Sequence, residues 1–357
     1  MPSYYEEKTK TWFCKFYYQD YTGTRRQKKK RGFKLQREAK EWERNFLERQ
    51  QGQPDMTMES LIEIYMEDTR QRMKASTIYA KENRIEVHIL PYFGKHPINA
   101  ITPAHIRKWQ TELMKRTTQT GQPLSPTYLN VLHHTLSSLF NYAVRYHGLK
   151  INPCIIAGSI GKSKSGVMGF WTLDEYRQFI SSVDHPLYRP IFEVLYYTGV
   201  RVGELLALTF RNIDLENGII HISKTLKRIG YENIISTPKT AKSKRDILIP
   251  CFLVEELKEY YKHVYDPGLD DLVFPTLRAN ILYNLKQYAK RAGVKEIRVH
   301  DLRHSHVALL VELGFNPLLI AERLGHEDIK TTLNTYSHLY PNKQIELINK
   351  LDSLVPN

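Results

Sequence analysis

The chain has 357 residues, of which 52 are Lys or Arg and 38 are Asp or Glu, so its formal net charge is +14 at pH 7. This length allows two or three domains with full-sized cores, and the positive charge favours a polyanionic partner such as a nucleic acid or an anionic membrane face. No apolar run approaches the roughly 20 residues of a membrane span, and the N-terminus lacks the apolar core of a signal peptide. We therefore expect a soluble, intracellular protein whose three cysteines are reduced, packed thiols.

The first fifty residues predict a small basic module of strands followed by one helix. "TWFCKFYYQD" is rich in aromatic residues, "YTG" indicates a turn, and "LQREAKEWERNFLERQ" has the composition of a helix. Between them lies a run of basic residues without an acid, namely Arg25, Arg26, Lys28, Lys29, Lys30, Arg31 and Lys34. Such a run is commonly a solvated hairpin, but its aromatic neighbours favour contact with a nucleic acid.

Residues 54–152 predict an all-helical domain. Thr102-Pro103 and Ser125-Pro126 each place a capping hydroxyl before a proline at the first helical position. The second helix continues with an apolar stripe at helical spacing, which predicts a buried face. The flexible stretch "AGSIGKSKSGVMG" then predicts a linker, 153–169, to the last segment.

Residues 170–357 predict a mixed, mainly α domain. "TLDE" is a capping box in which Thr172 caps a helix and Glu175 reaches back. The stretches "GIIHISKT", "ENIISTPKT" and "RDILIP" predict one small antiparallel sheet, and helices follow it. The predicted fold class is thus mainly α with small β-sheets (α+β), divided into 1–53, 54–152, the linker 153–169 and 170–357.

Two stretches of this last domain carry conspicuous cations. In "TGVRVGELLAL", Arg201 follows a glycine-containing break and Glu204 lies one turn later, which on its own indicates a structural ion pair. "TPKTAKSKRDILIP" is a turn between two strands that carries Lys239, Lys242 and further cations. Most lysines in turns are simply solvated, so neither stretch alone identifies a site.

A third stretch, "VHDLRHSHVALLVELG", predicts an anion site at the start of a helix. We expect Asp301 to be the N-cap and Gly314 the glycine at the C-terminus, so that His300 lies just before the helix and Arg303 in its first turn. The free amides and the positive end of the helix dipole favour phosphate. The histidines at 300, 304 and 306 also allow a metal site, but the HExxH pattern and a clustered carboxylate or cysteine are missing.

A fourth stretch, "GHEDIKTTLNTYSHL", places His326 ten residues before Tyr336. On one unbroken helix these two side chains would be about 15 Å apart along the axis and could not share a site. Asn316 and Pro317 start a short helix, however, and Gly325 ends it, so the chain can turn immediately before His326.

Together, a tyrosine, two arginines, two histidines and a lysine suit the transfer of a phosphodiester onto a phenol. A phenol is a poor nucleophile at its free pKa of about 10, so it needs a base and a positive field. Arginines supply that field to the oxygens of the transition state, and a lysine on a mobile turn can protonate the leaving 5' oxygen.

In this order and spacing, "TGVRVGELLAL", "HDLRHSH", "LGH" and "TYSH" resemble the motifs of the tyrosine recombinases, also called the phage integrase family. The resemblance implies catalytic roles for Arg201, Lys239, His300, Arg303, His326 and the nucleophile Tyr336, with Glu204 in support. Lys242 competes with Lys239 because both lie in the same turn. The resemblance also implies an arm-binding, a core-binding and a catalytic domain, and a reaction without metal or nucleotide cofactor.

The resemblance implies a site-specific DNA integrase that integrates and excises a phage or conjugative element through a 3'-phosphotyrosyl intermediate. Its expected partners are double-stranded DNA, a homotetramer on synapsed DNA, an excisionase and a host DNA-bending protein, and its expected place is the cytoplasm and nucleoid of a bacterial host. A Xer-like resolvase, a topoisomerase-like nicking and closing enzyme, and a non-enzymatic architectural DNA-binding protein are the alternatives. Apolar residues spaced three apart in the tail predict a helix that docks either on its own domain or on a neighbouring subunit, namely Ile345, Ile348, Leu351 and Leu354.

Overall fold

The computed structural model describes residues 3–7, 9–19, 25–50, 56–118, 120–161, 169–230, 232–237 and 241–336. Lys239 and the tail residues Ile345, Ile348, Leu351 and Leu354 therefore lie outside the described residues. The chain divides into two compact units, Met1–Gly166 and Val167–Asn357, and each is described by itself.

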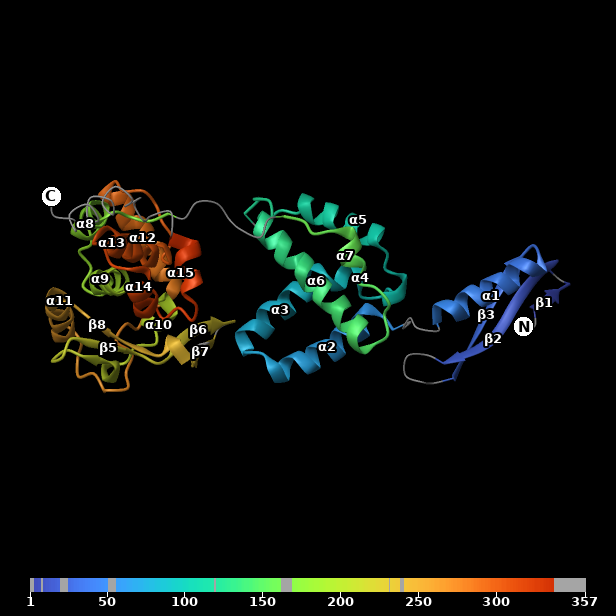
Figure 1. The fold of residues 1–357 in the computed structure, drawn as a ribbon, viewed down its shortest axis with the longest axis horizontal. Coiled ribbons are helices and arrows are strands. Elements are labelled where there is room, and N and C mark those ends of the chain that lie inside the picture. Colours follow the sequence, from blue (N-terminus) through green and yellow to red (C-terminus); the bar gives the residue numbers. More distant parts are fainter. Residues whose placement is uncertain are drawn as a thin grey trace, which may run out of the picture. The chain divides into compact units, whose positions relative to one another are not determined.

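The N-terminal module is a three-stranded antiparallel sheet with one helix on it (Figure 1). Its strands are β1 (Ser3–Glu6), β2 (Thr11–Gln19) and β3 (Arg25–Phe33), in that order, and its helix is α1 (Gln36–Gln50). Successive side chains of a strand point to opposite faces, so Cys14 and Phe16 of β2 are buried with Ala39 of α1. The predicted strands and helix are confirmed.

The second part of the same unit is a helical bundle with its own core. Its helices are α2 (Met58–Arg72), α3 (Ala75–His88), α4 (Leu90–Phe93), η1 (Ile98–Ala100), α5 (Pro103–Lys115), α6 (Pro126–Tyr146) and α7 (Pro153–Ala157). Thr102 and Ser125 cap α5 and α6 as predicted, since their hydroxyls accept hydrogen bonds from the backbone N–H groups of His105 and Tyr128.

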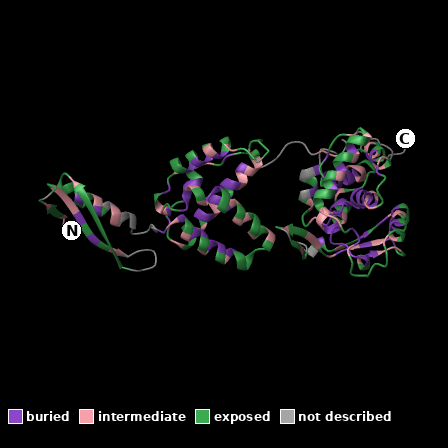
Figure 2. Ribbon diagram, turned by 180° about the vertical axis from the view of Figure 1, so that it is seen from behind, coloured by how far each residue is buried: buried purple, intermediate pink, exposed green. Residues whose placement is uncertain are grey.

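The apolar stripe of α6 is buried in this bundle, as Figure 2 shows by colour. Asn152 caps α7 by accepting a hydrogen bond from the N–H of Cys154, and Cys154 is fully buried against the same core. Residues 153–157 of the predicted linker therefore form a packed helix, and the bundle extends into that segment.

The second unit is mainly helical, with two small sheets on one side of its core (Figure 1). Its helices are α8 (Leu173–Ser181), α9 (Tyr188–Thr198), α10 (Val202–Leu205), η2 (Phe210–Asn212), η3 (Ala241–Ser243), α11 (Cys251–Lys262), α12 (Arg278–Ala292), α13 (Asp301–Glu312), α14 (Pro317–Leu324) and α15 (Ile329–Tyr336). The predicted capping box between Thr172 and Glu175 is present at the start of α8.

The single sheet predicted for this unit is corrected to two antiparallel sheets. One contains β4 (Ile213–Asp214), β5 (Ile219–Ile222) and β8 (Arg245–Leu248), and the other is the hairpin of β6 (Thr225–Ile229) and β7 (Glu232–Ser236). Ile220 and Ile247 face each other across β5 and β8 and are buried, so the core selects this long-range pairing. The hairpin closes on itself after Gly230, whose φ of 60° suits a tight turn.

The structure also bears on the predictions about the cysteines and about a membrane span. Cys14 and Cys154 are buried thiols, but Cys251 is exposed at the first residue of α11, so the prediction of a packed thiol is wrong there. Among the residues that the structure describes, no helix is long and apolar enough to cross a membrane.

Candidate active site

Arg201 lies at a sharp change of chain direction between α9 and α10. Gly199 ends α9 with a φ of 66°, and a Cβ at this glycine would come within 2.6 Å of the His306 ring, so both conformation and space require glycine. Arg201 then caps α10, and its Nη1 donates to Glu204 Oε1 at 2.8 Å. Glu204 is 3 % exposed but the side chain of Arg201 is 38 % exposed, so the guanidinium is fixed on one side and open on the other.

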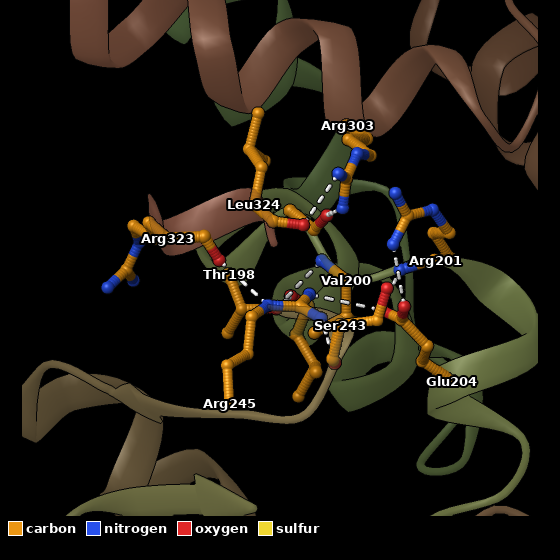
Figure 3. A network of polar contacts seen from close by, with 11 residues as sticks. Thr198, Val200, Arg201, Glu204, Ser243, Arg245, Arg303, Arg323 and Leu324 are labelled. Carbon is orange, nitrogen blue, oxygen red and sulfur yellow. Dashed lines mark hydrogen bonds and ion pairs between the residues drawn. The ribbon is translucent and has the colours of Figure 1, made fainter. Parts of the chain in front are cut away.

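Arg245 shares the carboxylate of Glu204 and is buried, which the sequence did not predict. Its guanidinium donates to Glu204 Oε2 at 3.0 Å, to the Ser243 carbonyl at 3.1 Å and to the Arg323 carbonyl at 2.9 Å (Figure 3). The sequence grouped Arg245 with the lysines of a solvated turn, although it also opens the predicted strand "RDILIP". It is the first residue of β8 and lies on the same face as the buried Ile247. The alternation of "RDILIP" was the signal that could have identified it.

Arg303, in the first turn of α13, is held by the ends of two other helices. Its Nη1 donates to the Gly199 carbonyl at 2.6 Å and its Nη2 to the Leu324 carbonyl at 2.8 Å. These carbonyls lie at the C-termini of α9 and α14, where the helix dipole is negative. Burial, and then the charge of Arg201, lowers the pKa of Arg303 to about 9, so the guanidinium remains charged at neutral pH.

The predicted start of α13 needs a correction of one residue. His300 is the N-cap and Asp301 is the first helical residue, because the Asp301 N–H already closes a turn onto the Arg298 carbonyl at 2.8 Å. The carboxylate of Asp301 turns back to accept from the Arg298 backbone at 2.8 Å and from its Nη2 at 2.7 Å. The helix ends at Glu312, and Gly314 follows with a φ of 83°.

His326 lies next to the cations as an uncharged imidazole. Its Nδ1 is 2.7 Å from the Thr332 hydroxyl, which orients the ring from α15. Burial, followed by the charges of Arg303 and Arg201, lowers the pKa of His326 to about 4. The ring is therefore neutral at pH 7, and Nε2 is left available for a phosphate oxygen.

His300 lies beside the same charges at the start of α13. Its ring meets that of His304 edge-on, with centroids 5.1 Å apart and planes at 83°. Although the residue is exposed overall, desolvation of its ring, then His304 and Arg303, lowers its pKa to about 4. His300 is thus a second neutral imidazole at this site.

The predicted interruption of the helix between His326 and Tyr336 is confirmed. Gly325 ends α14 with a φ of 66°, and the His326 N–H closes the turn onto the Ala321 carbonyl at 3.0 Å. The next helix, α15, starts at Ile329 and ends at Tyr336. The histidine and the tyrosine therefore lie on opposite sides of a turn rather than on one rigid helix.

The phenol of Tyr336 is buried and bonded to a histidine that the sequence had considered only as a metal ligand. Tyr336 is 2 % exposed, and its Oη lies 2.5 Å from Nδ1 of His304. Burial raises its pKa to about 12, although the charges of Arg303 and Arg201 oppose this shift. The phenol is therefore protonated at neutral pH and lies within the field of both arginines.

The choice between Lys239 and Lys242 stays open. Lys239 is outside the described residues, whereas the Lys242 Nζ donates to the Glu327 carbonyl at 3.0 Å, one residue beyond His326. Lys242 is thus near the site but already engaged by the backbone.

The three histidines considered as metal ligands contact other groups. His304 binds Tyr336, and the His306 Nε2 accepts a hydrogen bond from Arg323 Nε at 3.2 Å. Arg323 also donates to the Tyr197 and Leu248 carbonyls, which ties α14 to α9 and β8. Within the described part of the chain, no three His, Cys, Asp or Glu side chains are grouped to hold a metal ion.

The basic residues of the N-terminal module divide between the two faces of β3. The Lys29 Nζ lies 4.3 Å from the ring centroid of Phe13, on the face away from α1. The Lys28 Nζ lies 5.6 Å from the ring of Phe46, which belongs to α1. The basic residues that are consecutive in the sequence therefore lie on two faces of the strand and do not form a single patch.

In the second unit, the arrangement is a cluster of cations that could bind an anion, with a buried phenol beside it. Arg201 and Arg245 share the carboxylate of Glu204, whereas Arg303 is held by backbone carbonyls, so three guanidinium groups face one carboxylate in this network and a net positive charge remains (Figure 3). Guanidinium groups match the oxygens of a phosphodiester and stabilise the charge that develops as it is attacked. The neutral imidazoles and the phenol can exchange protons there.

Three family descriptions match successive parts of the chain. An arm DNA-binding domain matches residues 2–50, the SAM-like N-terminal domain of phage integrases matches 57–114, and the phage integrase family matches 170–343.

Individual proteins extend these matches. The chain is 34 % identical to the ICEBs1 integrase of Bacillus subtilis over 337 residues, 90 % of this chain and 88 % of that protein. It is 33 % identical to the integrase of Staphylococcus phage L54a over 51 % of this chain and 58 % of that protein. Its fold is similar to that of the Tn1549 transposon integrase in complex with a circular intermediate DNA, with a TM-score of 0.69 and 20 % identity over 84 % of this chain and 100 % of that one. A lambda integrase dimer bound to a COC' core site gives a TM-score of 0.58 and 18 % identity, over 77 % and 97 % of the two chains. The chain thus belongs to the phage integrase family of tyrosine recombinases, the site-specific integrases that cleave and rejoin DNA strands.

Proposed function

We propose that the chain integrates and excises a phage or conjugative element through a covalent 3'-phosphotyrosyl intermediate. The Oη of Tyr336 attacks the scissile phosphorus and displaces the 5' oxygen, and the 5'-hydroxyl of the partner strand later attacks the same phosphorus and releases Tyr336. The observation that carries this proposal is that the buried phenol is bonded to His304, the residue after Arg303, whose guanidinium is held by the carbonyls at the ends of α9 and α14.

Arg201 and Arg303 hold the non-bridging oxygens of the scissile phosphate in this reaction. Glu204 supports Arg201 by fixing one side of its guanidinium, which leaves the other side for the phosphate. Because guanidinium groups supply the stabilising charge, the proposed reaction uses neither a metal nor a nucleotide cofactor. Removing one preorganised donor of this kind costs about 3 kcal/mol in the cleavage barrier.

The remaining proposed catalytic residues handle phosphate oxygens and protons. His300 and His326 are neutral and can donate hydrogen bonds to the phosphate without adding charge. Lys239 protonates the leaving 5' oxygen, and Lys242, held by the Glu327 carbonyl, is the competing candidate.

The proposed partner is double-stranded DNA, and the similar integrases of Tn1549 and lambda have been solved bound to DNA. We assign residues 1–53 to arm sites, the helical bundle that starts at residue 54 and includes α7 to core sites, and 170–357 to catalysis. We place the reaction on a synaptic homotetramer in the bacterial cytoplasm and nucleoid, assisted by an excisionase and a host DNA-bending protein. The segment after Pro341 docks on a neighbouring subunit in this assembly.

A suicide DNA substrate tests the proposed function. With a core site nicked so that the cleaved fragment diffuses away, the wild-type chain should form a DNA adduct that survives denaturant. Tyr336→Phe should bind the same site with unchanged affinity and form no adduct. An adduct in this variant would contradict the assignment and direct attention to Tyr340.

The adduct assay excludes a non-enzymatic protein, and relaxation and recombination assays separate the remaining alternatives. A purely architectural DNA-binding protein forms no adduct at all. A topoisomerase-like enzyme relaxes supercoiled DNA without joining two sites, and a Xer-like resolvase recombines core sites without need of arm sites. An integrase requires both kinds of site for integration.

A further inference from the structure

The proposed nucleophile is hydrogen-bonded to a residue for which the sequence analysis predicted no catalytic role. Tyr336 Oη and His304 Nδ1 are 2.5 Å apart, a short hydrogen bond between two buried side chains. The two rings lie 5.4 Å apart at 57°, so packing as well as hydrogen bonding fixes their relative position. Among the residues that the structure describes, no other side chain has a hydrogen bond to this phenol.

The surroundings of His304 determine which partner carries the proton. Its Nε2 faces Asp301 Oδ1 at 4.0 Å. Arg298 holds that carboxylate through its backbone N–H and its guanidinium. A carboxylate on the Nε2 side favours the tautomer with hydrogen on Nε2, which leaves Nδ1 as an acceptor. The phenol therefore donates the hydrogen bond to Nδ1 of His304. Burial lowers the pKa of His304, but Asp301 acts to raise it and is placed to stabilise the imidazolium that forms when the proton is transferred.

The two histidines of the family motifs are engaged elsewhere. The Nδ1 of His326 is bonded to the Thr332 hydroxyl, and the ring of His300 packs on His304. Both lie beside the cations that would hold the phosphate, which suits contact with its oxygens. Neither has the direct access to the phenolic proton that His304 has.

We propose that His304 is the catalytic base of strand cleavage, accepting at Nδ1 the proton that Tyr336 loses on attack; this inference rests on the proposed function. In that step the Oη–H bond breaks as the Oη–P bond forms, the P–O5' bond breaks, and the 5' oxygen takes a proton from Lys239. In the ligation step the incoming 5'-hydroxyl gives its proton to lysine, and His304 returns a proton to the departing phenolate. Asp301 acts as a positioning residue.

Three variants test this role in the full chain on the suicide DNA substrate. General base catalysis contributes on the order of 10²–10⁴-fold, so His304→Ala and His304→Asn should each form the adduct at least about 100-fold more slowly. Asparagine can still accept the phenolic hydrogen bond but cannot take up the proton. A matched control is His306→Ala, which removes a buried imidazole from the same helix without touching Tyr336.

Chemical rescue separates a base from a packing residue. Imidazole added to His304→Ala should restore adduct formation in proportion to the concentration of its neutral form, and it should not restore His306→Ala. A 5'-phosphorothiolate substrate, which needs no acid to leave, should rescue Lys239→Ala but leave the defect of His304→Ala in place.

Several results would overturn the role of His304. One is wild-type cleavage rates in His304→Asn, and another is equal rescue of both alanine variants by imidazole. Faster cleavage by His304→Ala would instead identify the contact as a latch that restrains the tyrosine. Throughout, an adduct with wild type and none with Tyr336→Phe keeps the proposed function intact, so failure of this inference is distinguishable from failure of the reaction itself.

Discussion

Replacing Glu204 with glutamine tests the charge balance on which the site depends. Its Oε1 accepts from the guanidinium of Arg201, and its Oε2 accepts from the backbone of Arg201 at 3.0 Å and from the Arg245 guanidinium at 3.0 Å. Glutamine keeps the shape but brings an NH₂ group, which must face a donor of one arginine. It also removes the only carboxylate that is hydrogen-bonded to these two cations among the described residues.

The cost follows from how the pair is buried. Breaking a buried ion pair by removing one partner costs about 3–5 kcal/mol. The side chain of Arg245 is 7 % exposed, but that of Arg201 is 38 % exposed. Solvent therefore weakens the ion pair between Arg201 and Glu204. We therefore expect Glu204→Gln to lower the free energy of unfolding by about 3 kcal/mol, which corresponds to a fall in Tm of about 6–12 °C for a domain of this size.

The pH dependence gives the prediction a definite sign. Burial acts to raise the pKa of Glu204, but the charge and hydrogen bond of Arg245 and the charge of Arg201 outweigh it, so the pKa lies below its ordinary value of 4.5. The stabilisation is thus fully present above pH 4.5 and is lost as the pH falls through the lowered pKa. In urea unfolding, the difference in the free energy of unfolding between wild type and Glu204→Gln should be largest at neutral pH and should decrease below pH 4.5.

Glu193→Gln is the matched control. Glu193 is also buried, but burial and the nearby Glu256 raise its pKa to about 7. Its charge is unfavourable in the folded state, so the variant should unfold like the wild type below pH 4.5, gain stability over the wild type as the pH rises from 4.5 to 7, and keep the full advantage above pH 7. If Glu204→Gln costs no more than Glu193→Gln at pH 7, or if its cost is unchanged at pH 4, the ion pairs do not stabilise the site as argued.

Four further outcomes are expected. Gly325→Ala should lower Tm well beyond Gly314→Ala, because both have positive φ but only at Gly325 would a Cβ lie 3.0 Å from a backbone carbonyl; equal Tm values would contradict this. Lys239→Ala should form the adduct more slowly on a normal site and at the wild-type rate on a 5'-phosphorothiolate site, and a defect on both sites would show that another residue is the general acid. Deleting residues 1–53, whose core is separate, should spare cleavage of an isolated core site but impair integration at arm sites, whereas unchanged integration would make the module dispensable. Truncation after Pro341 should preserve single-site binding but weaken the synaptic tetramer in analytical ultracentrifugation, and unchanged assembly would exclude a role between subunits.

The sequence was sufficient wherever the deciding interactions are local. The caps at Thr102 and Ser125 depend on a hydroxyl three residues from the amide that it binds. The break at Gly325 depends on the positive φ of one glycine. Such features also fixed the order of helices and strands, and with the ordered motifs they identified the family and the residues proposed for catalysis.

The tertiary structure decided what depends on distant partners. Arg245 lies 78 residues from the Arg323 carbonyl that it binds, and His304 lies 32 residues from Tyr336. A cation in a polar stretch reads the same in sequence whether it is solvated or buried, because its desolvation is offset only by groups that folding brings to it. The sequence by itself therefore determined the motif residues proposed for catalysis, and only the packing of α9, β8, α13, α14 and α15 brought Arg245 and His304 to them.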